Sequence, residues 1–63
     1  MDIAAKIRGY LKETGRTQTY LSRQTGLSET AMSQTLAGKR HLRLEEYCSI
    51  CRALHVKPGF FLQ

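Results

Sequence analysis

The stretch from Gly26 to Arg40, GLSETAMSQTLAGKR, decides the fold prediction for this chain. Its centre is a run of nine residues, 29–37, between Gly-Leu-Ser and Gly-Lys-Arg. Ser28 is a favoured N-cap residue, and Gly38 is of the type that commonly follows the last residue of a helix. We therefore predict one short helix over residues 29–37.

This predicted helix has two different faces when its residues are placed at about 100° intervals. Met32 and Leu36 lie on one face, edged by Ala31 and Thr35. The other face carries short polar groups and one carboxylate: Glu29, Thr30, Ser33 and Gln34. A plain solvated helix more often carries Lys, Arg and Glu at pairing distances. Gln can instead contact adenine, and Ser or Thr any base, in the DNA major groove. The face is therefore either an ordinary polar surface or one that reads bases.

The rest of the chain repeats the helical pattern, and no run of alternating apolar residues indicates a strand. We predict an all-α fold of four to five short helices in a single domain over residues 1–63. Asp2 and Thr17 are the expected N-caps of the first two helices, residues 2–14 and 17–24, and a helix over 44–54 should follow. Pro58 could begin a final turn. One apolar face is expected on the fourth helix: Leu44, Tyr47, Cys48, Ile50, Cys51 and Leu54.

Charge and spacing favour nucleic acid as the partner. Ten Lys and Arg against five Asp and Glu give a net charge of +5, which suits a polyanion, with an anionic membrane as second choice. The short turn at residues 25–27 has helix-turn-helix spacing. Lys39, Arg40 and Arg43 follow the central helix, where they can reach phosphates flanking a groove. Free N–H groups at Thr17 and Gln18 offer a further phosphate contact.

At this point the chain resembles the small helical DNA-binding domains of the phage Cro and repressor (XRE) type. The resemblance runs from residue 17 to 62 without a gap. It rests on Thr17-Gln18, Leu21, Gly26-Leu27-Ser28, Met32-Ser33, Gly38-Lys39-Arg40, Leu44, Ile50, Ala53-Leu54, Val56 and Phe61-Leu62.

The resemblance implies a role for each matching polar residue. Base edges or nearby phosphates would be contacted by Glu29, Thr30, Ser33 and Gln34. Backbone phosphates would be contacted by Thr17, Gln18, Lys39, Arg40 and Arg43, and Gln18 could also brace a side chain of the central helix. It further implies a homodimer on a double-stranded operator with two half-sites about one helical turn apart.

Several residues depart from the family pattern. Leu36, with Leu11, stands where relatives often have an ion pair, and an apolar contact can replace such a pair without loss of stability. His55 replaces a helix-ending Gly, and Arg43 a capping Ser or Thr. Glu29 is acidic where relatives often have Gln, Arg or Ser. It is either an acceptor for cytosine N4 or a helix-dipole partner in the first turn.

Catalytic and metal chemistry find little support in the sequence. Cys48, Cys51 and His55 could share one side of a helix, but a closed zinc site needs four ligands, and these cysteines fall on an apolar face. We therefore favour packing over metal or redox chemistry. Ser28 has no His–Asp pair to activate it, and no glycine-rich phosphate loop is present. We expect no enzyme activity, no cofactor and no metal.

We therefore expect a sequence-specific, double-stranded DNA-binding transcription regulator, acting as a phage or prophage repressor in the cytoplasm. It should be a homodimer on DNA, and weakly associated or monomeric in solution. No signal peptide or membrane span is apparent. Two rivals remain open: a protein-binding helical module such as an antitoxin, and a metal- or redox-responsive regulator using the two cysteines and His55.

Overall fold

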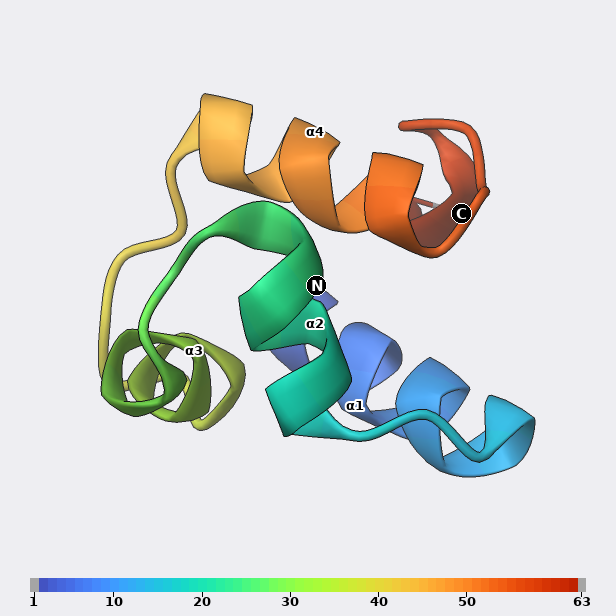
Figure 1. Ribbon diagram of the computed structural model, residues 1–63. Coiled ribbons are helices and arrows are strands. Elements are labelled where there is room, and N and C mark those ends of the chain that lie inside the picture. The colour runs from blue at the N-terminus through green and yellow to red at the C-terminus, as the bar shows by residue number, and fades with distance from the viewer. Residues whose placement is uncertain (1, 63) are drawn as a thin grey trace.

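The computed structural model describes residues 2–62 and confirms the all-α prediction (Figure 1). Within these residues no strand is present. Four α-helices are followed by one short 3₁₀ helix. They are α1 (Ile3–Thr14), α2 (Gln18–Thr25), α3 (Glu29–Leu36), α4 (Leu44–Ala53) and η1 (Phe60–Leu62). The predicted bounds agree with these to within about one residue.

The first three helices begin at the N-caps that the sequence predicts. The Asp2 carboxylate accepts a hydrogen bond from the Ala5 N–H at 3.0 Å, and the Thr17 hydroxyl accepts one from the Tyr20 N–H at 3.0 Å. Ser28 caps α3 through the Ala31 N–H at 3.1 Å. Each bond satisfies a backbone donor that the first turn of a helix leaves unpaired, and so fixes where the helix starts.

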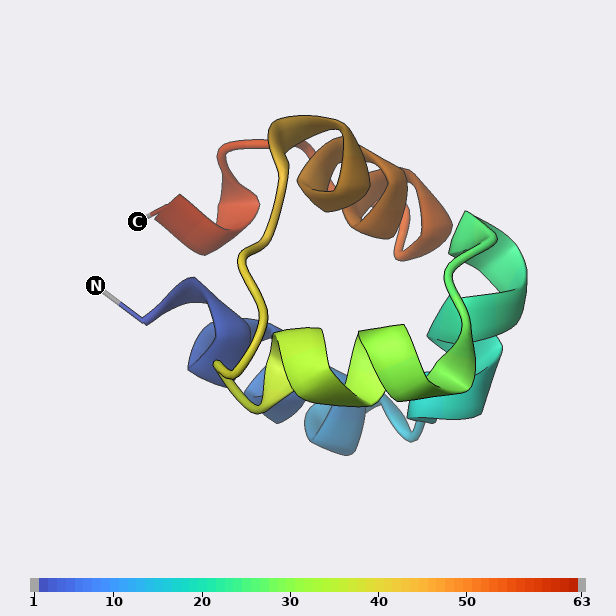
Figure 2. The ribbon, with the colours of Figure 1, turned by 90° about the vertical axis from the view of Figure 1, so that its left-hand side faces the viewer.

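The core is one cluster of apolar side chains supplied by every helix. Helix α2 packs against α3 and α4, while α1 packs against α3 and η1 (Figures 1 and 2). Leu11 and Leu36 are both buried in this cluster. The buried members are Ile7, Leu11, Leu21, Met32, Leu36, Tyr47, Ile50, Cys51, Leu54 and Phe61.

The prediction that Leu44 belongs to the buried apolar face of α4 is wrong, because 75% of the Leu44 surface is exposed. Leu42, from the preceding loop, packs against the core instead. A helical wheel gives the direction in which a side chain points, but it does not show whether that turn of the helix reaches the core. Leu44 lies in the first turn of α4, and that turn leaves its side chain exposed.

The end of α4 carries the strain that its sequence predicts. His55 follows the C-cap Leu54 with φ of 59°, in the left-handed region that favours glycine. A final turn then forms after Pro58, with the Phe60 N–H bonded to the Lys57 carbonyl at 2.9 Å. It buries the Phe61 side chain in the core and leaves Phe60 half exposed.

Candidate nucleic-acid interface

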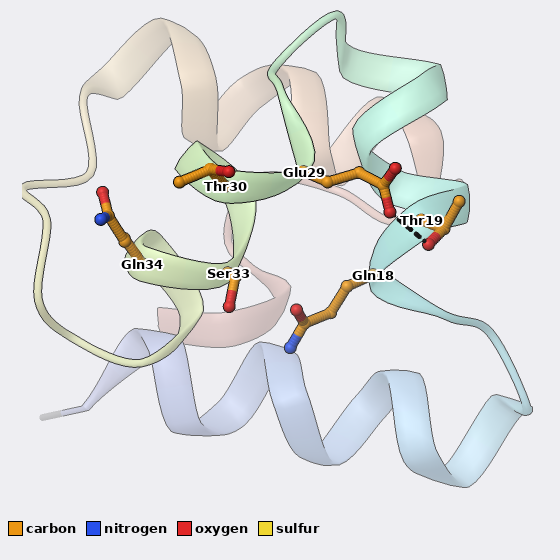
Figure 3. Close-up of a pocket in the computed structure, with 6 residues that line it drawn as sticks. All are labelled: Gln18, Thr19, Glu29, Thr30, Ser33 and Gln34. Atoms are coloured by element: carbon orange, nitrogen blue, oxygen red, sulfur yellow. Dashed lines mark hydrogen bonds between the residues drawn. The ribbon is translucent and has the colours of Figure 1, made fainter.

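The polar face of α3 and the start of α2 line one open hollow of about 500 Å³ (Figure 3). All four side chains predicted to contact bases lie here, together with Gln18. In Figure 3 Gln18 and Ser33 point into the same space from the two helices, and Gln34 lies on the side of α3 toward the loop that follows it. The lining residues are Gln18, Thr19, Glu29, Thr30, Ser33 and Gln34.

A tight turn brings these two helices together. Gly26 ends α2 with φ of 82°, and its N–H bonds to the Ser22 carbonyl at 3.0 Å. Ser22 is buried, and its hydroxyl donates to the Leu27 carbonyl at 2.5 Å. A side chain with Cβ would be strained at Gly26, so glycine allows α3 to start with only three residues between it and the end of α2. The turn thus sets the angle at which α3 presents its polar face.

The opposite face of α3 is fixed to the core. Met32 and Leu36 are fully buried, and Thr35 is 1% exposed, with its hydroxyl donating to the Ala31 carbonyl at 2.8 Å. From α1, the Arg8 guanidinium donates to the Leu36 carbonyl, one of the acceptors that the end of a helix leaves unpaired. The two faces predicted from the wheel are therefore both present, one buried and one exposed.

Three cations predicted to contact phosphates follow the end of α3, but only two of them are exposed and without a paired carboxylate among residues 2–62. Lys39 and Arg43 are exposed. Arg40 instead makes a two-bond ion pair with Glu46, at 2.9 and 2.8 Å, and also donates to the Thr35 hydroxyl at 3.1 Å. It therefore braces the loop between α3 and α4.

Comparison with known families decides the class of protein. Residues 6–62 match the model of the Cro/C1-type HTH DNA-binding domain, which is most of the chain. The chain belongs to this family. No curated protein and no solved structure gave a significant match. In this Cro/C1-type domain, α2 and α3 are the two helices of the helix-turn-helix, and the protein is a DNA-binding regulator.

The Cro/C1-type domain starts α4 with a cap that differs from the expected one. Arg43 has no oxygen to offer as a side-chain cap, and Glu46 instead reaches back to accept from the Arg43 N–H at 3.1 Å. The hydrogen bond from Arg40, followed by that of the Arg43 N–H, lowers the pKa of Glu46 to about 2. The carboxylate therefore stays charged throughout the physiological range and holds the loop that carries Lys39.

A contact missed by sequence reasoning joins the two helices of the motif. The Thr19 hydroxyl donates to Glu29 Oε1 at 2.8 Å, and both residues line the hollow (Figure 3). No spacing rule relates a residue in the first turn of one helix to one in the first turn of the next. The pair becomes visible only when the angle between the helices is known.

Packing explains Cys51 of the Cro/C1-type domain, whereas Cys48 is only partly buried. Cys51 is 1% exposed within the core, and burial raises the pKa of its thiol, which opposes formation of the reactive thiolate. His55 is exposed. Among residues 2–62, no three His, Cys, Asp or Glu side chains are arranged to hold a metal ion. None of the helices described is long and apolar enough to cross a membrane.

Proposed function

We propose that this DNA-binding regulator is sequence-specific and places α3 in the major groove of double-stranded DNA. One observation carries the proposal: α3 exposes a face of short, uncharged hydrogen-bonding groups plus one carboxylate beside the start of α2. Lysines and arginines would suffice for affinity alone. Thr30, Ser33 and Gln34 instead match the donors and acceptors of base edges. Together with Glu29, they are the proposed base contacts.

The proposed phosphate contacts surround this face. Lys39 and Arg43 are exposed after the end of α3, and the N-terminus of α2 offers backbone donors at Thr17 and Gln18. We propose Arg40 as a secondary contact, since the ion pair with Glu46 occupies part of its fork of five donors. Such contacts fix the register of α3 without discriminating between bases.

The biological role that we propose is repression by occupancy. A bound domain covers its operator and blocks polymerase, and the residue pattern is most like phage or prophage repressors. It would act in the cytoplasm of a bacterial or phage-infected cell, where its operator lies. With half-sites about one helical turn apart, a homodimer would form on the DNA.

Selection of bound sequences from a random pool of duplexes tests the proposal. We expect a short motif to be enriched, repeated in inverted orientation at a spacing of about one helical turn. Binding without any enriched motif would leave a DNA-binding domain that does not read sequence. A failure to bind random duplex even at low salt would favour the rival protein-binding module.

A further inference from the structure

We propose that Glu29 reads a cytosine in the operator and that Thr19 is the positioning residue that aims its carboxylate. This inference rests on the proposed function, since it requires α3 to face the base edges. It assigns a base to one position of the half-site, and it resolves the choice between a base contact and a helix-dipole role for Glu29.

The geometry begins with the bond between the two helices. The Thr19 hydroxyl, in the first turn of α2, donates to Glu29 Oε1 at 2.8 Å, although the two residues lie ten apart in the sequence. Thr19 is half buried, whereas Glu29 is exposed. A flexible carboxylate on a helix surface samples several rotamers. The bond to Thr19 favours one rotamer, and that rotamer keeps the carboxylate in the hollow (Figure 3).

Acceptor capacity remains on the carboxylate after this bond. An ionised carboxylate has two oxygens with about four lone-pair sites, and Thr19 uses one of them. Glu29 forms no ion pair with any of residues 2–62, so no cation neutralises the charge. A docked base would therefore meet an acceptor whose favoured direction is set by Thr19 and whose charge no cation among residues 2–62 pairs with.

Only one base suits such an acceptor well in the major groove. Cytosine presents the N4 amino donor, whereas guanine presents the N7 and O6 acceptors and thymine the O4 acceptor with a methyl group. Adenine offers its N6 amino donor, but the N7 acceptor lies next to it and repels the carboxylate. Glu29 therefore selects cytosine largely by penalising the other three bases, because a buried, unmatched charge is costly.

The helix dipole alone explains less of what is observed. An acidic residue in the first turn stabilises a helix wherever its side chain points. Glu45 occupies the first turn of α4 in that way, exposed and without a side-chain partner among the residues described. Glu29 differs because it is tethered across the motif and lines the hollow with the other proposed base contacts.

The test repeats the random-duplex selection with the whole chain and four variants. In E29Q the amide can donate as well as accept, so we expect the cytosine at one position to be replaced by adenine, with a change in relative enrichment of roughly five- to 150-fold. T19V removes the hydroxyl but keeps the shape of the side chain. It should weaken the cytosine preference at that same position without creating a new one, and T19S should restore it. E45Q removes a matching first-turn charge and should leave the motif unchanged.

The outcomes separate this inference from the function on which it rests. A motif that is enriched by the wild-type chain and unchanged in E29Q would overturn the reading of cytosine while sequence-specific binding stands. A shift in E29Q with full cytosine preference in T19V would overturn the role of Thr19 alone. If the wild-type chain enriches no motif, the proposed function fails, and the assignment of Glu29 fails with it.

Discussion

Replacing Gln34 by alanine should weaken binding to the operator and relax the preference at one base position. The side chain is exposed and makes no hydrogen bond with residues 2–62, so its loss should change the free energy of unfolding by less than about 0.5 kcal/mol. A bidentate contact between Gln and adenine discriminates against other bases by roughly 1–3 kcal/mol. At about 1.4 kcal/mol per tenfold, the dissociation constant on the cognate site should rise by roughly five- to 150-fold.

Lys39→Ala is the matched comparison for this substitution. Lys39 is exposed directly beyond the end of α3, and its backbone N–H bonds to the Gln34 carbonyl at 2.9 Å, so both changes perturb the same end of the helix. The lost side chain here is a proposed phosphate contact. Binding to all sequences should weaken alike, and the slope of log K against log salt should become shallower by about 0.9.

Fluorescence anisotropy measures both effects. Each variant is titrated with the selected duplex, with its single-base substitutions and with random duplex, at several salt concentrations. For Gln34→Ala we expect a loss of affinity that depends on the base at one position. For Lys39→Ala we expect the same loss of affinity on every duplex. An equal loss on every sequence for Gln34→Ala would refute its assignment to base reading.

Three further predictions concern the scaffold that presents α3. Met32→Ala should cost about 2–5 kcal/mol in urea unfolding, because the side chain is fully buried between the helices, and a domain of this size has little stability to lose. His55→Gly should raise the free energy of unfolding by about 0.5–1 kcal/mol, because φ of 59° costs a residue with Cβ about 1–2 kcal/mol and the greater freedom of glycine in the unfolded chain offsets only part of that gain. Glu46→Gln should lower stability at neutral pH. The folded pKa of Glu46, about 2, lies below its ordinary value, so its contribution is present above about 4.5 and is lost as the pH falls toward 2. Unfolding curves of the wild type and Glu46→Gln should therefore converge at the acidic end, and a constant difference down to pH 2 would contradict the role of the ion pair with Arg40.

The sequence was sufficient to predict features that depend only on residues close together in the chain. N-caps at Asp2, Thr17 and Ser28, and the buried face of α3 at Met32 and Leu36, follow from spacings of three or four residues within one helix. Those rules hold whatever the helices pack against. The arrangement of the proposed base contacts on one exposed face follows from the same periodicity.

Features that depend on how the helices are arranged in space could not be predicted from the sequence. The pairing of Thr19 with Glu29 needs the angle set by the turn at Gly26, and the ion pair of Arg40 with Glu46 needs the path of the loop. Of these residues, the sequence marked Arg40 as a phosphate contact and left Glu29 open between a base contact and a helix-dipole role. Leu44 is a third case, since its depth depends on where α4 begins relative to the core.

The central claim is that the face of α3 beside the start of α2 is where the protein meets DNA. Two-dimensional NMR of the labelled chain, titrated with the selected duplex, tests it directly. The largest amide shifts are predicted at residues 17–19, 28–34 and 39–43. Shifts concentrated instead around Tyr10 of α1 and Phe60 of η1, which line a separate hollow, would contradict that claim.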